Sequence, residues 1–238
     1  MSKPDLIGGI GLTHVRVYEQ RPAPDGTNSG CAHVHGVTDE AYYVVGGRGQ
    51  VELHDLKKGF RTVALEPGGY VQFPAGTLHR VVSSGALELL VIMDNGGLAE
   101  LGDARIYFGP EIDEAPAEFE RLVSLENSQG LDGALARRDA SARGYTDLIG
   151  LWSDDRAAYR RELERFVALH WQTVGARRED FTAVIRGSAQ HWLELARSRF
   201  DAPHAAVPDN CAAVLRDQPG VFFGMSGILR YFNSLTSA

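Results

Sequence analysis

Cysteine is scarce in this chain of 238 residues, and long apolar runs are absent. The two cysteines, Cys31 and Cys211, lie far apart in sequence, so no disulfide framework is indicated and a reducing, cytoplasmic location is expected. No run reaches the roughly 18 apolar residues of a membrane span. The opening residues MSKPDLIGGIGL also lack the charged and apolar regions of a secretory signal. We therefore expect no membrane partner.

Lysine is almost as rare as cysteine, because it occurs only at Lys3, Lys57 and Lys58. The formal net charge is −7, and no run of lysine or arginine offsets it. An acidic protein repels a phosphate backbone, so we expect no nucleic-acid partner. The hydrophobic content of 44% is enough for a buried core. A chain of this length can form one or two domains.

Two signatures of other enzyme classes are also missing. The glycines near the start, GGIG, precede a predicted strand and do not open a helix, so they do not indicate a nucleotide-binding loop. The serines lack the G-x-S-x-G setting of a nucleophile elbow. Neither dinucleotide binding nor serine hydrolase chemistry is therefore indicated.

Histidines at metal-ligand spacing are the main feature that is present. His33 and His35 are two residues apart, so on a strand their side chains leave the same face. Glu40 follows after a link of turn length, and His79 follows a Pro-Ala-Gly turn. Three imidazoles and one carboxylate form a donor set that suits first-row divalent metals. We predict that His33, His35, Glu40 and His79 bind one divalent transition metal.

These segments resemble the two motifs of the cupin superfamily, G-x5-H-x-H-x3-4-E-x6-G and G-x5-P-x-G-x2-H-x3-N. The matching residues are His33, His35, Glu40, Gly47, Gly68, Pro74, Gly76 and His79. The opening glycine of the first motif falls on Thr27, and Ser83 replaces the closing asparagine of the second. Neither position is a metal ligand in the family, so the resemblance implies the same four ligands. It covers residues 12 to 94 approximately, and the C-terminal half resembles no family that we recognise.

The patterning along the chain predicts an α+β protein in two parts. Residues 12–94 read as short strands separated by Gly-rich turns, which favours an antiparallel sandwich or barrel and fits a cupin jelly roll. Residues 95–116 are rich in glycine, proline and acids, which indicates a linker or a lid over the barrel. We predict a cupin β-barrel over residues 1–110. A helical region over residues 111–238 should pack on the barrel or on a partner subunit.

Helical periodicity predicts helices at about 131–150, 154–174, 179–199, 209–217 and 219–235. The second should begin after Ser153 as its N-cap and bury one stripe of side chains. That stripe consists of Tyr159, Leu163, Phe166, Val167, His170 and Val174. The last helix would carry an apolar stripe from Val221 to Leu235 that needs a covering surface, so we predict a homodimer.

Three histidines of the helical half, His170, His191 and His204, have no carboxylate or cysteine at ligand spacing. We interpret them as packing or surface residues. Along the strands, the parity that turns the metal ligands inward also turns the following side chains inward: Cys31, Tyr42, Val44, Val81 and Ser83. Phe73 and Met93 are expected nearby. Cys31 is interpreted as a small buried hydrophobe.

The catalytic residues expected from this arrangement are Glu40 and Tyr42. Tyr42 is the ionisable side chain predicted nearest the metal, and it is either part of the barrel core or a substrate contact. The family resemblance implies a metal-dependent enzyme. A dioxygenase is favoured, in which Fe(II) binds O₂ and a small enol, diketone or catechol-like substrate together.

Other functions stay open at this point. Ni, Mn, Zn or Cu are alternative metals for the same ligands. A redox-inactive ion would support a lyase, isomerase or cyclase in which Glu40 or Tyr42 moves a proton. A non-catalytic protein that binds a metal or a small molecule is an alternative from another class.

Overall fold

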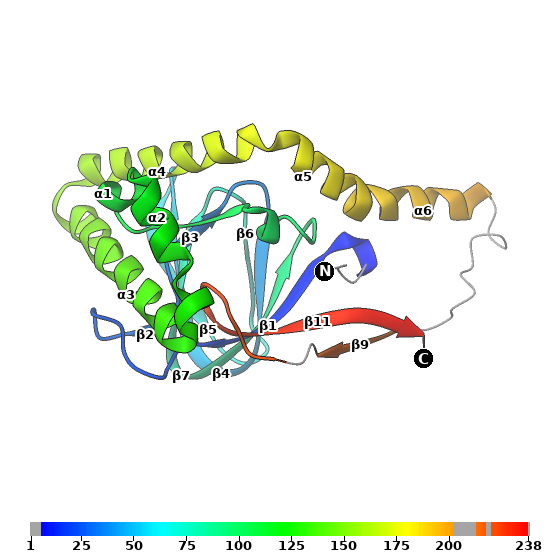
Figure 1. Cartoon of the computed structure of the whole chain (residues 1–238), viewed down its shortest axis with the longest axis horizontal. Helices are drawn as coiled ribbons and strands as arrows, with labels where there is room; N and C mark the ends of the chain where they lie inside the picture. Colours follow the sequence, from blue (N-terminus) through cyan, green and yellow to red (C-terminus); the bar gives the residue numbers. More distant parts are fainter. Residues whose placement is uncertain (1–5, 202–212, 218–219, 238) are drawn as a thin grey trace.

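The computed structural model describes residues 6–201, 213–217 and 220–237 (Figure 1). Its first strands are β1 (Gly11–Val17), β2 (Asn28–Ser29), β3 (His33–His35), β4 (Glu40–Asp55), β5 (Gly59–Leu65), β6 (Tyr70–Phe73), β7 (Leu78–Met93) and β8 (Ala104–Ile106). Strands β9 (Ala213–Asp217), β10 (Phe222–Phe223) and β11 (Gly227–Ser237) follow the helices.

The helices lie between β8 and β9 in sequence. They are α1 (Pro110–Asp113), α2 (Pro116–Val123), α3 (Leu125–Asp154), α4 (Arg156–Ala176), α5 (Arg178–Ile185) and α6 (His191–Asp201), with a π-helical turn η3 (Arg186–Gln190) before α6. Two short 3₁₀ turns, η1 (Ile7–Gly9) and η2 (Ala99–Leu101), flank the barrel strands. In Figure 1 the strands form a central barrel, α1 to α4 cover one side, and α4, α5 and α6 run end to end above it.

Two long strands, β4 and β7, form the longest strand pair of the barrel. They pair antiparallel from Glu40 opposite Met93 to His54 opposite Leu78. The side chains that fill the interior alternate along the strands, as a half-buried sheet requires. They include Val15, Val17, Tyr42, Val44, Val51, Leu53, Phe73, Val81, Leu89 and Val91. The predicted inward parity is confirmed for Tyr42, Val44 and Val81, and Cys31 and Ser83 are buried too.

A layer of helices covers one outer face of this sheet. Val34 of β3 belongs to a cluster with the barrel residues Leu78 and Tyr107, and the helix side chains of the cluster include Leu148 and Phe166. His33 and His35 on either side of Val34 are buried as well. Because successive side chains of a strand leave opposite faces, β3 places its histidines in the barrel while Val34 packs on the helices.

The predicted helices at 131–150, 154–174 and 179–199 are confirmed, and the six stripe residues of α4 are all buried. The predicted cap is wrong, because Ser153 lies inside α3 and bonds to the Ile149 carbonyl. Asp155 caps α4 instead, accepting hydrogen bonds from the backbone of Ala157 and Ala158 at 3.0 and 2.9 Å. No helix within the described ranges is long and apolar enough to cross a membrane.

The two helices predicted at the end of the chain are wrong where the structure describes them. Residues 213–217 form β9, and residues 227–237 form β11, which pairs with β1 from Thr13 opposite Tyr231 to Val17 opposite Gly227. Residues 209–212 and 218–219 lie outside the described residues. The segment is rich in aromatic and β-branched residues, and the free edge of β1 supplies backbone partners that an isolated helix lacks. The homodimer was predicted from the apolar stripe of the last helix, which is not formed where the structure describes this segment. The homodimer itself stays a prediction.

The predicted boundary between residues 1–110 and 111–238 also stays a prediction, although strand β11 of the second range belongs to the sheet of the first. The turn before β11 reaches the segment that leads into β3, because the Met225 carbonyl accepts a hydrogen bond of 2.8 Å from the backbone of Cys31.

Gly227 is the residue that permits β11 to lie this close to β1, because a Cβ atom there would lie 2.0 Å from the Arg16 carbonyl oxygen. We expect Gly227→Ala to lower the free energy of unfolding by about 2 kcal/mol or more. Gly175→Ala is the matched control, since a Cβ on this α4 residue meets nothing within 4 Å. It should raise stability by up to about 1 kcal/mol. Urea denaturation measures both, and equal effects would show that Gly227 is not critical.

The junction between the barrel and the helices buries a histidine of β4. His54 lies 2.8 Å from the Tyr159 hydroxyl through Nδ1 and 2.8 Å from the Tyr145 hydroxyl through Nε2. A neutral imidazole can donate to one hydroxyl and accept from the other. Burial, reinforced by nearby Arg61, lowers the pKa of His54 to about 3.

This buried imidazole should make the protein sensitive to acid. The pKa of His54 is lower in the folded chain than the value of about 6.5 when unfolded, so the unfolded chain binds the extra proton. The contribution of neutral His54 to the free energy of unfolding is complete above pH 6.5 and is lost as the pH falls toward 3. Between pH 7 and pH 4 the free energy of unfolding should fall by about 3 kcal/mol more in the wild type than in His54→Gln. Denaturation curves at the two pH values test this, and parallel losses would contradict it.

Candidate metal centre

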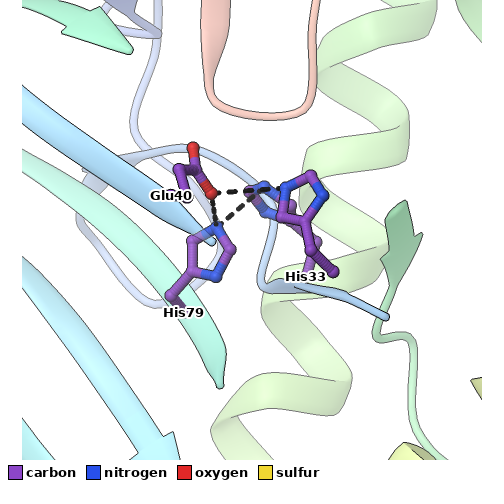
Figure 2. Close-up of side chains that lie close together, drawn as sticks. His33, Glu40 and His79 are labelled. Atoms are coloured by element: carbon purple, nitrogen blue, oxygen red, sulfur yellow. Dashed lines mark hydrogen bonds and ion pairs between the residues drawn. The ribbon is translucent and has the colours of Figure 1, made fainter. Parts of the chain in front are cut away.

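The structure brings all four predicted ligands together at one end of the barrel. His33 and His35 come from β3, Glu40 begins β4, and His79 is the second residue of β7. One donor atom from each lies within 4.8 Å of the others, and all four side chains are buried. Figure 2 shows His33, Glu40 and His79 pointing toward one another. Such a cluster can hold a metal ion.

The distances define a compact donor set. Nε2 of His79 lies 2.9 Å from Nε2 of His33 and 3.0 Å from Oε2 of Glu40. Nε2 of His35 lies 3.3 Å from the same carboxylate oxygen. Despite this proximity, the buried atoms His35 Nε2 and Glu40 Oε2 have no partner in hydrogen-bond geometry within the described parts of the chain. Buried polar atoms are rarely left unsatisfied, so these two indicate that a cation belongs between them.

Each imidazole is oriented by a second contact through its other nitrogen. Nδ1 of His33 lies 3.0 Å from the Cys31 carbonyl, and Nδ1 of His79 lies 3.0 Å from the Thr77 carbonyl. A carbonyl only accepts, so Nδ1 carries the proton in each ring and the neutral tautomer leaves a lone pair on Nε2. Two such lone pairs facing each other at 2.9 Å cannot hydrogen-bond, but both can bind a metal.

The orienting partner of His35 is Asp103, which the sequence reasoning missed. Its carboxylate lies 3.3 Å from His35 Nδ1 and also accepts hydrogen bonds from the backbone of Gly36, Val37 and Thr38 at 3.1, 2.8 and 3.2 Å. Asp103 is itself fully buried. It therefore holds both the ligand and the turn that leads from β3 to Glu40.

Asp103 lies in the segment predicted as a linker or lid, and that prediction is wrong in this part. Residues 104–106 form β8, which pairs with β3 from His33 opposite Ile106 to His35 opposite Ala104. The alternating run ARIYF after Gly102-Asp103 was a strand signal that pointed to this pairing.

The helical layer also reaches this residue. His170 of α4 is buried, as predicted for a packing residue, and its Nε2 donates a 2.6 Å hydrogen bond to the Asp103 carbonyl. His191 is exposed, as predicted for a surface residue. His204 lies outside the described residues.

The electrostatics of the cluster follow from burial and close charges. Burial favours the neutral form and, together with His79, lowers the pKa of His33 well below its ordinary value. Burial opposes charge on His35 as well, but the hydrogen bond to Asp103 and the nearby negative charge of Glu40 raise its pKa to about 9. The pKa of Glu40 is lowered well below its ordinary value, since the neighbouring histidines outweigh the effect of burial. Burial would raise the pKa of Asp103, but His35 and the hydrogen bonds from Thr38 and Val37 lower it to about 2. Both carboxylates are thus ionised.

Tyr42 and Phe73 form the interior wall beside the ligands. The ring centroid of His79 lies 4.6 Å from that of Phe73 and 6.3 Å from that of Tyr42. The Tyr42 hydroxyl is buried, and no described residue partners it in hydrogen-bond geometry. Burial and the Glu40 carboxylate raise the pKa of Tyr42 well above its ordinary value, so the hydroxyl keeps its proton.

Three solved structures illustrate the similarity of the barrel to known proteins. A protein with a double-stranded β-helix domain from Klebsiella pneumoniae subsp. pneumoniae MGH 78578 is 13% identical, with a TM-score of 0.32, over 42% of this chain and 75% of that chain. WlaRA, a TDP-fucose-3,4-ketoisomerase from Campylobacter jejuni, is 12% identical, with a TM-score of 0.29, over 35% of this chain and 58% of that chain. The DMSP lyase DddQ from Ruegeria pomeroyi DSS-3 is 22% identical, with a TM-score of 0.29, over 38% of this chain and 40% of that chain.

No protein with a curated function matches the chain. A family model does match: residues 20–93 correspond to Cupin_2, described as a cupin domain, and this is less than half of the chain. The match spans the four clustered residues and the strands that position them. Residues 20–93 are therefore a cupin domain, and the helices of the chain lie outside it.

Proposed function

We propose that this chain is a metal-dependent enzyme that acts on a small organic substrate, and that its reaction is a dioxygenation. The observation that carries the proposal is the convergence of four buried donor atoms, two of which have no partner in hydrogen-bond geometry. A polar cluster of this kind costs stability unless a cation satisfies it. Keeping such a cluster inside an apolar barrel therefore favours a function that uses the ion.

His33, His35, Glu40 and His79 would hold the ion, which we propose to be Fe(II). Such an ion supplies open coordination positions and a route for electrons between a chelated substrate and O₂. The residues around it perform the remaining tasks. Cys31, Thr77 and Asp103 orient the three imidazoles through their Nδ1 atoms. Phe73 and the other core side chains keep water from the reacting atoms.

The same surroundings support our proposal for the substrate class. An enol, diketone or catechol-like molecule offers two oxygen atoms for chelation and an apolar body for the barrel wall. The Tyr42 hydroxyl keeps its proton and has no partner in hydrogen-bond geometry among the described residues, so it is available to donate a hydrogen bond to one of those oxygens. A small substrate and O₂ are the partners that we propose, and neither nucleic acid nor a membrane is needed.

The unpartnered hydroxyl of Tyr42 also supports a second function. A redox-neutral lyase, isomerase or cyclase needs a group that donates a proton to a substrate polarised by the metal. Tyr42 is suited to that role because it is buried beside Glu40 and keeps its proton. The two functions differ in whether O₂ is consumed.

Asp103 gives the first test, because it supports the metal centre without belonging to the ligands. We expect Asp103→Asn to weaken metal binding about 10- to 100-fold, since the orienting carboxylate of His35 is lost. The affinity for Fe(II), Mn(II) and Zn(II) can be measured by competition with a chelator. Asp94→Asn is the control, because the Asp94 carboxylate lies in the same region and accepts its hydrogen bonds from the Asp39 backbone and the Asn95 side chain. His79→Ala should abolish binding, and unchanged affinity in both Asp103→Asn and His79→Ala would rule out this centre.

Oxygen consumption gives the second test. The purified protein, loaded anaerobically with Fe(II), should consume O₂ with at least one member of a panel of catechols, β-diketones and flavonol-like enols. His33→Ala should show no uptake. Substrate turnover without O₂ uptake would instead establish the redox-neutral function, and no turnover by a fully loaded protein would favour a binding role.

A further inference from the structure

A pocket opens where the turn between β4 and β5 meets the corner between α3 and α4. Its volume is about 480 Å³, within the range of small-molecule sites. The residues that line it are Asp55, Leu56, Lys57, Lys58, Gly59, Trp152, Arg156, Tyr159, Arg160 and Leu163. None of them belongs to the metal centre.

Positive charge is concentrated at this pocket in an otherwise acidic chain. Four of its lining residues are cationic and one is acidic, whereas the whole chain carries a net charge of −7. Two of the three lysines of the sequence, Lys57 and Lys58, lie side by side here. The one carboxylate of the lining, on Asp55, is already paired with Arg61. The local field therefore favours an anion.

Most of these cations have no carboxylate partner of their own. Among the described residues, no ion pair involves Lys57, Lys58 or Arg156, while Arg160 pairs with Glu164 at 2.9 Å. Three positive charges are thus available to a ligand. The same number of exposed cations scattered over the surface would not create this field, because salt screens charges separated by more than about 10 Å.

Contacts within the protein hold the turn of Lys57 and Lys58 and the side chain of Arg156 in place. The Asp55 carboxylate accepts hydrogen bonds from the backbone of Lys57 and Lys58 at 2.8 and 2.7 Å, which fixes the turn. The Arg156 guanidinium lies 3.1 Å from the ring centroid of Trp152. The indole also lies close to the turn, since a Cβ atom on Gly59 would lie 2.3 Å from Cζ3 of Trp152. A stacked guanidinium keeps its N–H edge available for an anion.

The floor of the pocket is apolar. Leu163 and Tyr159 are buried beneath it, and the Tyr159 hydroxyl is already bonded to His54. Leu56 and the indole of Trp152 complete the apolar surface. We propose that this pocket binds a small organic anion, whose phosphate or carboxylate group contacts Lys57, Lys58 and Arg156 while its apolar part packs on Trp152. Such an anion could be a soluble molecule or the headgroup of a lipid.

The site is separable from the metal centre. The pocket and the metal centre share no residue, although Asp55 lies only two positions beyond Leu53, the residue of β4 that pairs with His79. A failure of metal binding or of oxygen uptake would leave this proposal unaffected.

Calorimetric titration of the full chain with phenyl phosphate tests the proposal. Phenyl phosphate should bind more tightly than phenol or inorganic phosphate, and its Kd should rise with added salt. Lys57→Ala combined with Lys58→Ala should raise the Kd about tenfold or more. The matched control is Arg178→Ala combined with Arg197→Ala, which removes two exposed cations from α5 and α6. It should leave the Kd unchanged.

Vesicles distinguish the two sources of the anion. The protein can be sedimented with vesicles of pure phosphatidylcholine or of phosphatidylcholine that contains phosphatidic acid. If the wild type sediments only with the vesicles that contain phosphatidic acid, and the double lysine variant does not sediment with them, the anion is a lipid headgroup. Binding of phenyl phosphate in solution without vesicle binding would identify a soluble ligand. Absence of both, or an equal Kd for phenyl phosphate in the wild type and the double lysine variant, would overturn the proposal.

Discussion

The hydrogen bonds of the Asp103 carboxylate are the constraint on which the metal centre depends. One side chain accepts from three consecutive backbone N–H groups and from His35, and its own carbonyl accepts from His170 of the helical layer. A buried carboxylate needs this many donors to stay ionised. The turn after β3, one metal ligand and helix α4 are therefore connected through a single residue.

The clustering of His33, His35, Glu40 and His79 could be predicted from the sequence, because their spacing and the resemblance to the cupin motifs both pointed to it. A spacing of two on a strand places His33 and His35 on one face, and the Pro74-Ala75-Gly76 turn precedes the strand of His79. The inward parity of Tyr42 follows from the same alternation. Asp103 could not be predicted in this way, because a single aspartate in a Gly-rich segment shows no periodicity. Its role appears only when β8 pairs with β3.

The last strands show where prediction from helical periodicity fails. Residues 221–235 contain apolar side chains at helical spacing, yet the segment from Gly227 is a strand in the described structure. Periodicity describes only one segment, whereas the decisive partner, the edge of β1, lies at the other end of the sequence. The stripe on α4 was a reliable signal because its partners, α3 and the barrel face, bury it as a helix.

The pairing of β1 with β11 has a consequence for how the chain reaches its fold on the ribosome. Thr13 is made early and its partner Tyr231 is made more than two hundred residues later, so β1 has one unpaired edge throughout most of translation. Loop closure over such a separation is slow, and an exposed edge invites pairing with other chains. A nascent chain that has completed its cupin domain and helices is still open along this edge, and chaperones that shield strand edges should act on it until β11 emerges.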